Sequence, residues 1–503
     1  MSKKLIINCD SREIRVGAIE NERLVDLYIQ RPENQRVVGN IYKGRVENVL
    51  PGMQAAFIDI GLEKNAFLYV DDAVPTNHSG GANNPTNLDI QNVLRQGQEI
   101  VVQVIKEPFG TKGARVSTNI NIPGRYVVLM PLSKYIGISR KIEMELERER
   151  LRTISEGLFG KEQMGLIVRT VADGVTDRQL EVDYLYLKGL WEKVQKNLTK
   201  VKTPGLVHRD LEILPRVIRD VFTEDVNEVV IDTYEDYVAI VKIIESIAPH
   251  KKSCVTHYKG KDPIFHHYLI EQELDKALKQ KVWLKSGGYL IIDHTEALTV
   301  IDVNTGKFVG QSSLEETVVT TNVEAAREVA FQLRLRNISG IIIVDFIDMH
   351  IEGNQQKVLR VLEEELKKDR NKTHLLGITK LGLVEITRKK VRKSLNEFIM
   401  GTCQTCHGTG KTWSKEATTN KIDREVRHFL RYSKDDAIVI ELHEDIVSEF
   451  KGEQEEHIHR LEDEFGKRIF IRIKKHVPLQ HFNIVFSGEV RDATRIAKLT
   501  NFN

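Results

Sequence analysis

The chain has few cysteines and lacks any long apolar run. Its 503 residues include four cysteines, and no window approaches the roughly 20 apolar residues that a helix needs to cross a bilayer. The amino terminus begins with two lysines, but its apolar stretch ends after a few residues at Cys9, so it does not have the pattern of a signal peptide. We therefore expect a cytoplasmic protein whose cysteines stay reduced.

An excess of charge of one sign is also missing. Lys and Arg together number 74, Asp and Glu number 72, and the net charge is +2. This near-neutral total hides a local imbalance, because 388-RKKVRK-393 is nearly all basic. The mixed run 143-EMELERER-150 begins a helical pattern that we expect to end at Gly157. A basic run either follows phosphates or forms a solvated helix face, so charge alone identifies no partner.

The length of the chain predicts several domains, because 503 residues are too many for a single hydrophobic core. We expect three to five domains or subdomains. Residues 3–29 predict successive short strands joined by polar turns. Short alternating strands between residues 36 and 120 predict a small closed barrel, and its Gly-, Asn- and Pro-rich stretch 75–87 predicts a surface loop.

Three polar side chains lie at the ends of two strongly apolar strand patterns. Asp302 and Asn304 belong to the run 297-ALTVIDVN-304, and Asp345 belongs to 341-IIIVDFID-348. Successive side chains of a strand point to opposite faces, so Asp302 and Asn304 share a face. We therefore expect the two acids and the amide to converge.

The segment between these runs supports a metal site at the ends of the strands. Residues 315–337 have a helical pattern, which predicts a right-handed unit of strand, crossover helix and parallel strand. Ligands of open α/β sheets bind beyond the carboxyl ends of the strands, where Asp345 and Asp348 would emerge. Two carboxylates and an amide suit Mg2+, and phosphodiester hydrolysis is its natural use there. The alternative is that these acids only cap helices or terminate strands.

Three longer motifs resemble the ribonuclease E/G family of bacterial endoribonucleases. They are 286-SGGYLIIDHTEALTVIDVNTG-306, 332-QLRLRNISGIIIVDFIDM-349 and 403-CQTCHGTG-410. The motifs occur in the order of the family, and the resemblance extends over roughly residues 1–415. It implies that Asp302 and Asp345 bind catalytic Mg2+ and that Asn304 supports the site.

The resemblance also implies a multidomain α/β and α+β architecture. A split ribonuclease-H-like subdomain would contain an inserted oligonucleotide-binding (OB) barrel and a 5′-sensor subdomain. An α/β nuclease subdomain, a zinc link and a small α+β C-terminal region would follow. The expected bounds are 1–35 and 215–280 for the ribonuclease-H-like parts, 36–124 for the barrel, 125–214 for the sensor, 281–400 for the nuclease subdomain, 401–414 for the link and 415–503 for the C-terminal region.

Single-stranded RNA is the partner that the resemblance implies for the barrel. Phe57 and Phe67 lie on predicted barrel strands, and Lys112 lies in the Gly-flanked loop 110-GTKGA-114. All three match RNA-contacting positions of the family. An exposed aromatic ring contributes about 1–3 kcal/mol by stacking on a base. The residues alone favour a different interpretation, since aromatic side chains on short strands are usually buried.

Arg169 and Thr170 follow an apolar strand pattern that begins at Gly165. A guanidinium beside a hydroxyl suits a terminal phosphate, because charge-assisted hydrogen bonds to phosphate are short and strong. The resemblance implies a pocket that binds the 5′-monophosphate of RNA. Its residues would be Gly124, Val128, Arg140, Arg169, Thr170 and Lys372. Lys372 stands where the best-known members carry Arg, so we expect a weaker phosphate contact there.

Cys403 and Cys406 have the spacing of a zinc knuckle, and the glycines that follow let backbone amides approach the sulfurs. Structural zinc takes four ligands, so either a second subunit or another residue of the chain completes the site. The candidates within the chain are His407, Cys9 and Cys254.

Two other interpretations of this pair stay open from the residues themselves. CxxCH is also the attachment pattern of haem, which normally follows export, and the pair could be two coincidental thiols. The resemblance implies a zinc ion shared between subunits, and therefore a homodimer or a homotetramer. Gln404 departs from the proline usual in the family, which loosens the loop without removing a ligand.

The resemblance implies an enzyme that cleaves single-stranded RNA, senses its 5′ end and leaves 5′-phosphate and 3′-hydroxyl ends. Its roles would be rRNA and tRNA processing and mRNA decay. The helical pattern 421–436 and the strand patterns 437–442 and 469–475 favour the compact ribonuclease G branch. The alternatives are a non-catalytic RNA-binding regulatory protein, against which the intact acidic residues argue, and a metal-dependent deoxyribonuclease.

Overall fold

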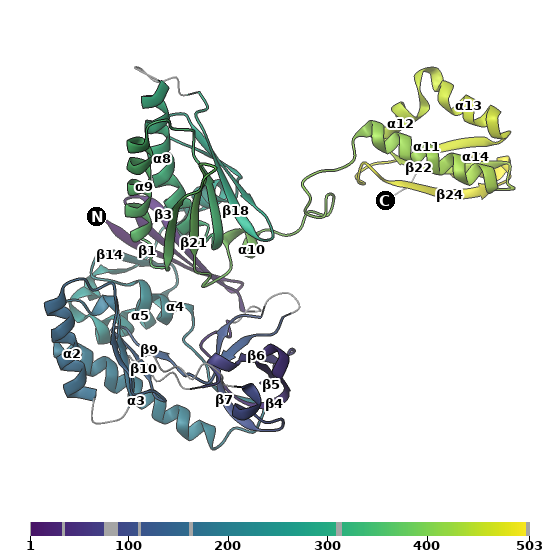
Figure 1. Cartoon of the computed structure of the whole chain (residues 1–503). Helices are drawn as coiled ribbons and strands as arrows, with labels where there is room; N and C mark the ends of the chain where they lie inside the picture. The colour runs from purple at the N-terminus through teal and green to yellow at the C-terminus, as the bar shows by residue number, and fades with distance from the viewer. Residues whose placement is uncertain are drawn as a thin grey trace. The chain divides into compact units, whose positions relative to one another are not determined.

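The computed structural model describes residues 2–32, 36–74, 89–108, 112–159, 164–307 and 314–498. The chain divides into two compact units, residues 1–398 and 399–503 (Figure 1). The stretch 75–87, predicted as a surface loop, lies outside the described residues. Across the part of the chain that the structure covers, no helix is long and apolar enough to span a membrane.

One sheet joins the beginning of the chain to a much later segment (Figure 1). Its strands are, in spatial order, β15 (Val255–His257), β14 (Val226–Ile231), β1 (Lys3–Cys9), β2 (Ile14–Glu20) and β3 (Arg23–Gln30). Leu5 and Ile7 are buried on one face, against α4 (Ile213–Val221) and α5 (Tyr234–Ile247). Ile6 is buried on the other face, with α6 (Ile264–His267) and α7 (Ile270–Ala277). The predicted strands of residues 3–29 are confirmed.

The next strands close into a small barrel. They are β4 (Ile41–Leu50), β5 (Ala55–Asp59), β6 (Ala66–Tyr69), β8 (Arg115–Ser117) and β7 (Glu99–Lys106), and β7 returns to pair with β4. Closure leaves no free sheet edge, and alternate residues such as Ile58 and Leu68 fill the interior. The short helix α1 (Ile90–Val93) also contributes to this core through Ile90. The predicted closed barrel is confirmed.

A smaller sheet follows the barrel. Its strands are, in spatial order, β11 (Ile136–Ile138), β12 (Gly165–Val168), β10 (Val127–Met130) and β9 (Ile122–Pro123). Helices α2 (Glu145–Phe159) and α3 (Asp177–Leu198) bury Leu151 and Leu180 against it. The predicted end of α2 at Gly157 is wrong, because the helix continues to Phe159. After α3, strand β13 (Gly205–His208) pairs with β4 of the barrel.

The last sheet of the first unit carries the acidic residues. Its strands are, in spatial order, β16 (Lys281–Trp283), β17 (Tyr289–His294), β18 (Leu298–Asn304), β19 (Gly340–Asp345), β21 (Val384–Arg388) and β20 (Thr373–Ile378). Helices α8 (Leu314–Leu335) and α9 (Glu352–Lys367) lie side by side and pack on one face, where Ile301 and Val344 are buried (Figure 1). Strands β18 and β19 are parallel and α8 connects them, which confirms the predicted strand, crossover helix and strand.

The second unit is a small α+β domain. Its central strand β22 (Ala437–His443) pairs with β23 (Arg468–Lys474) and β24 (Phe482–Gly488), which confirms the strands predicted at 437–442 and 469–475. Ile438 and Ile440 are buried beneath α11 (Lys415–Tyr432), α12 (Glu444–Lys451) and α13 (Glu456–Phe465). On the opposite face, Val439 packs against Ala493 of α14 (Val490–Lys498).

Candidate active site

Asp302, Asn304 and Asp345 lie together on one face of the sheet. Asp302 is the register partner of Asp345 across β18 and β19, and neighbouring strands lie about 4.8 Å apart. The Asn304 Nδ2 donates a hydrogen bond of 2.7 Å to Asp302 Oδ2. Both carboxylates are exposed, and Asn304 is half-buried. The structure therefore places Asp302 and Asn304 on one face, as strand periodicity predicts, and brings Asp345 beside them on the neighbouring strand.

The negatively charged carboxylates of Asp302 and Asp345 are neighbours across β18 and β19. Burial and the neighbouring carboxylates of Asp302 and Asp348 raise the pKa of Asp345. Among the described residues, no group of three or more His, Cys, Asp or Glu side chains is arranged to hold a metal ion. Mg2+ typically takes one or two protein carboxylates and completes its octahedron with water and substrate phosphate. The pair Asp302 and Asp345 fits that mode of binding, because a divalent cation between them would relieve their repulsion.

Close backbone packing holds the segment after Asn304 in place. A Cβ atom on Gly288 would lie 2.8 Å from the carbonyl oxygen of Asn304. A Cβ atom on Gly306 would lie 2.4 Å from the carbonyl oxygen of Gly287, and the backbone amide of Lys307 donates to that same oxygen. Only glycine allows such an approach between two backbones. The glycines of the first family motif therefore pack the β16–β17 turn against the acidic strand.

Two side chains of α8 position the loops around the site, and sequence reasoning missed both. The fully buried Asn322 donates to the carbonyl of Ile347 at 2.8 Å and accepts from its amide at 3.1 Å, which fixes the segment just after β19. The carboxylate of Glu324 accepts from the backbone amides of Lys285 and Ser286. The sequence contained a signal for Asn322, because an amide side chain stands there at a position where the helical period calls for an apolar residue.

Phe57 and Phe67 form a pair on the outer face of the barrel. They are register partners on β5 and β6, and their ring centroids lie 6.0 Å apart with 70° between the ring planes. Both side chains are half-buried, whereas the neighbouring Ile58 and Leu68 are fully buried. The expectation from the residues alone, that these aromatic rings belong to the core, is therefore wrong. An edge-to-face pair with accessible surface suits stacking on a base.

Lys112 is exposed close to this aromatic pair. A Cβ atom on the following residue, Gly113, would lie 2.0 Å from the carbonyl oxygen of Asn65, so the two backbones touch. Asn65 immediately precedes β6, the strand of Phe67, and the Phe67 amide donates to the carbonyl of Ala114 at 2.7 Å. These contacts keep the Lys112 segment beside the strand that presents Phe67.

Arg169 is held in a network of charged groups. Its Nη1 donates to the carbonyl of Gly124 at 2.5 Å, and its Nη2 donates to Asp220 Oδ1 at 2.9 Å. Arg219 binds the other oxygen of Asp220 at 2.8 Å. Burial acts to raise the pKa of Asp220, but the hydrogen bonds and charges of Arg219 and Arg169 outweigh it and lower that pKa. Sequence reasoning missed Asp220, because no local pattern connects it with Arg169.

Thr170 and Arg140 come from different segments that touch. The Thr170 hydroxyl oxygen lies 2.7 Å from that of Ser139, and both Arg140 and Thr170 are exposed. Val128 lies opposite Ile167 on the neighbouring strand, close to the start of this segment. Thr170 and Arg140 therefore lie at the surface on adjacent segments.

The segment of Lys372 reaches the same region. Lys141 Nζ donates to the carbonyl of Asp369 at 3.2 Å, and Arg370 Nη1 donates to the carbonyl of Asp220 at 3.0 Å. Lys372 lies two residues after Arg370 and is exposed. The loop before β20 is thus tied both to the turn of Arg140 and to the helix that carries the partner of Arg169.

The two cysteines of the predicted link lie in a tight turn. The amide of Gly410 donates to Cys406 Sγ at 3.3 Å, as the glycine content of the loop predicts. Hydrogen bonds from the backbone amides of Cys406 and Thr405 lower the pKa of Cys403, which favours the thiolate form that binds metal. Cys403 is exposed and Cys406 is half-buried.

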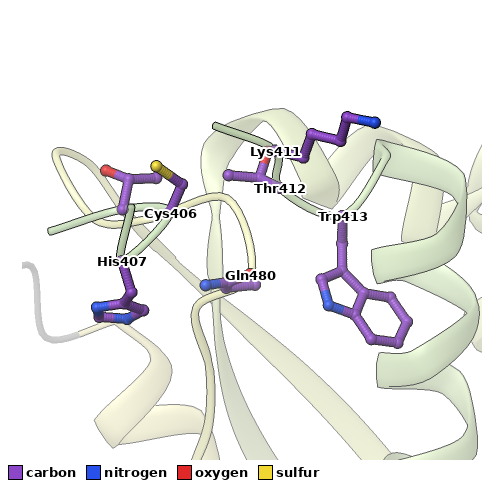
Figure 2. A pocket seen from close by; sticks show the side chains of 7 residues that line it. Cys406, His407, Lys411, Thr412, Trp413 and Gln480 are labelled. Atoms are coloured by element: carbon purple, nitrogen blue, oxygen red, sulfur yellow. The ribbon is translucent and has the colours of Figure 1, made fainter. Parts of the chain in front are cut away.

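The alternative zinc ligands within the chain differ in environment. Cys9 and Cys254 pack against the apolar core of the first unit, where burial raises the pKa of both thiols. High thiol pKa values disfavour metal binding. His407 lines the same hollow as Cys406 and Trp413, but Figure 2 shows its ring pointing away from the Cys406 sulfur.

Two parts of the chain match known protein families. Residues 121–391 match the Ribonuclease E/G family, and residues 402–487 match the RNase E/G thioredoxin-like domain. The chain is 41% identical to Ribonuclease G of Escherichia coli strain K12 over 488 residues, which cover 96% of this chain and 100% of that protein. The chain belongs to the ribonuclease E/G family.

Other family members distinguish its two branches. Ribonuclease G of Haemophilus influenzae is 40% identical over 488 residues, covering 96% of this chain and 99% of that protein. Ribonuclease E of Nostoc sp. strain PCC 7120 is 40% identical over 417 residues, but the match covers only 59% of that protein. The full-length agreement with ribonuclease G confirms the expected branch of the family.

Proposed function

We propose that the chain is a Mg2+-dependent endoribonuclease that cleaves single-stranded RNA and senses its 5′ end. Membership of the ribonuclease E/G family supports the endoribonuclease activity. The observation that carries the chemistry is the register pairing of Asp302 with Asp345 beside Asn304. In the cytoplasm, the proposed roles are rRNA and tRNA processing and mRNA decay.

Asp302 and Asp345 would hold the ion. When bound there, Mg2+ would polarise the scissile phosphate and lower the pKa of a water molecule. Asn304 orients the Asp302 carboxylate through its amide NH2 group and presents a carbonyl oxygen as a further hydrogen-bond acceptor. Water attacks phosphorus, the bond to the 3′ oxygen breaks, and the products carry 5′-phosphate and 3′-hydroxyl ends.

The barrel would hold the RNA strand. The half-buried rings of Phe57 and Phe67 offer faces to bases, and the exposed Lys112 offers a positive charge to phosphate. This combination binds single strands, because only unpaired bases present a free face to an aromatic side chain. We also propose the subdomain bounds that the family implies, among them 36–124 for the barrel.

The 5′ monophosphate would bind the guanidinium of Arg169 together with the Thr170 hydroxyl. Gly124 and Asp220 already orient that guanidinium, so phosphate would meet a fixed group. Val128, Arg140 and Lys372 would complete the pocket. A single ammonium at Lys372 cannot make the forked contact of an arginine, so we expect a modest preference for the monophosphate.

The cysteine pair would join two copies of the chain. Each copy would supply Cys403 and Cys406 to one zinc ion, which gives a homodimer or, as a dimer of dimers, a homotetramer. The lowered pKa of Cys403 and its exposure support a ligand that faces outward.

The proposed function is tested by incubating the purified protein with a single-stranded RNA oligonucleotide and with its DNA counterpart. We expect RNA cleavage with Mg2+, none with EDTA, and much slower cleavage of DNA. Binding of RNA without cleavage in Mg2+ would favour the regulatory role instead. Faster cleavage of DNA would favour a deoxyribonuclease.

A further inference from the structure

An aromatic and cationic cluster lies on the edge of the nuclease sheet. Trp283 and Tyr289 are register partners on β16 and β17, with ring centroids 5.4 Å apart and 64° between the ring planes. The Lys281 Nζ lies 3.5 Å from the centroid of the Tyr289 ring and 4.1 Å from that of Trp283. Trp283 keeps 58% of its surface exposed. We call Lys281, Trp283 and Tyr289 the Trp283 cluster.

Strand register places the Trp283 cluster beside the acidic residues. Tyr289 is the register partner of Asn304, and paired residues of an antiparallel ladder point to the same face with Cβ atoms about 5 Å apart. Asp302 shares that face because it lies two residues from Asn304. Trp283 is one strand further away, which gives about 10 Å between its backbone and that of Asn304. The cluster and the candidate metal ligands therefore form one continuous row.

The Trp283 cluster is built on a rigid part of the molecule. The Leu284 amide donates to the carbonyl of Gly288 at 2.8 Å, which closes the turn between the two aromatic residues. Glu324 of α8 accepts hydrogen bonds from the same turn. A Cβ atom on Gly306 would lie only 3.2 Å from the Tyr289 ring, so the loop after β18 packs against it. A binding surface fixed in this way loses little entropy when it is occupied.

Charge favours a polyanion as the occupant of this surface. Lys281 carries a positive charge between the two rings, and the exposed Lys285 and Lys307 lie in the two adjoining loops. A flat ring with a cation at its side offers stacking to a base and attraction to a phosphate. The RNA strand that is cleaved at Asp302 and Asp345 must pass through this neighbourhood, because register partners cannot lie far apart.

We propose that the Trp283 cluster is a nucleotide-binding subsite in which a base next to the scissile phosphate stacks on Trp283. Lys281 holds the phosphate of that nucleotide. The subsite accepts any base, since every base has a flat face. This inference rests on the proposed function and adds a second stacking surface, on a different sheet from Phe57 and Phe67.

Tryptophan fluorescence reports stacking without any need for cleavage. The chain has three tryptophans, of which Trp191 is 7% exposed and Trp413 belongs to the second unit. In a Trp413→Phe background, Trp283 is the exposed emitter. Adding a single-stranded oligoribonucleotide in EDTA should quench this emission with saturation, and replacing Trp283 by Phe in that background should abolish the quenching. Normal RNA binding by anisotropy with no quenching would overturn the inference.

Kinetics tests the role of the ring in cleavage. Trp283→Ala should raise KM for single-stranded RNA roughly tenfold and leave kcat within about twofold, as expected for the loss of one stacked base. Trp283→Phe should restore most of the affinity, whereas Trp283→Leu, which is apolar but not flat, should not. Tyr186→Ala is the matched control, because Tyr186 is 61% exposed on helix α3, and its KM should not change.

An abasic nucleotide identifies the stacked position. Moving one abasic site along the oligonucleotide should raise KM at one position next to the cleaved bond in the unmutated protein, and this sensitivity should vanish in Trp283→Ala. Equal KM values for the Ala, Leu and Phe variants would overturn the inference, as would a changed oligomeric state with an unchanged KM, which would make this face a contact between copies. The failure of this inference and the failure of the proposed function give different results. If RNA quenches the fluorescence in EDTA but is not cleaved in Mg2+, the subsite exists and the proposed function is wrong.

Discussion

The acidic site and the proposed phosphate-sensor region are built in different ways. Backbone register aligns Asp302 with Asp345, and the amide of Asn304 lies beside them on the same strand as Asp302. Arg169 is instead oriented by Asp220, a side chain from a distant helix. A site aligned by register depends on its own ligands and little on its neighbours, whereas a site aligned by ion pairs can be tuned through either partner.

The largest loss of activity is expected at the acidic site, where strand register aligns the proposed metal ligands. Asp302→Asn should slow RNA cleavage by several orders of magnitude under single-turnover conditions, because it removes a charge that holds the metal where the transition state needs it. Folding and RNA binding should persist, since Asp302 is exposed. Asp348→Asn is the comparison, because Asp348 also acts on Asp345 through its charge but lies beyond the paired strands, so its loss should cost far less activity. Near-normal turnover of Asp302→Asn at saturating Mg2+ would contradict the proposal that Asp302 binds the metal ion.

The cysteine pair would be a third kind of site, which we propose is completed between two copies of the chain. Replacing both Cys403 and Cys406 by Ser should release zinc and divide the oligomer into smaller species. Light scattering with metal analysis measures both quantities. Cys254→Ser is the control, since Cys254 packs against the core of the first unit, and it should change neither. One zinc ion per chain, or an unchanged oligomer, would show that the site closes within a single chain.

At the ion pair of Arg169 and Asp220, substitutions should be able either to lower or to raise the preference for a 5′ monophosphate. Arg169→Gln should remove most of the preference for a 5′-monophosphorylated oligonucleotide over its 5′-hydroxyl twin without abolishing cleavage. Asp220→Asn should increase that preference a few-fold, because it removes a negative charge 2.9 Å from the guanidinium while keeping an oxygen that accepts from it. Thermal melting checks that both variants fold. If neither variant changes the ratio of the two rates, this pocket does not sense phosphate.

The smallest effect concerns Lys372, which is exposed and belongs to the proposed sensor pocket. Lys372→Arg should strengthen the 5′-monophosphate preference about twofold to fivefold, since a planar guanidinium can make two parallel hydrogen bonds to phosphate. Lys389→Arg serves as the control, because it makes the same chemical change at another exposed lysine, whose backbone amide donates to the carbonyl of Lys372. A preference that Lys372→Arg leaves unchanged would place the side chain outside the pocket.

Sequence patterns were sufficient where local periodicity decides the structure. The alternation in 297–304 predicted the shared face of Asp302 and Asn304, and the helical pattern that follows predicted a parallel partner strand. The closed barrel was predictable from its succession of short strands. The end of helix α2 was not predictable from the sequence, because the helix continues past Gly157. A glycine within a helix costs only about 1 kcal/mol, and packing on the sheet compensates for it.

Contacts between distant segments were beyond local patterns. Asp220 lies far along the chain from Arg169, and nothing in its own sequence marks it as the partner of a guanidinium. Asn322 positions Ile347 through a helix-to-loop contact that only the assembled fold creates. Trp283 stands out only when the register of β16 and β17 places it in line with Asn304. Such side chains require the three-dimensional structure to be recognised.

The central claim is that Asp302 and Asp345 together hold a divalent cation. Mn2+ is a paramagnetic substitute for Mg2+, so electron paramagnetic resonance can count the ions bound per chain in the unmutated protein and in the Asp302→Asn, Asp345→Asn double variant. We predict that the unmutated protein binds one more ion per chain than the double variant. Equal numbers of bound ions in the two proteins would contradict the account.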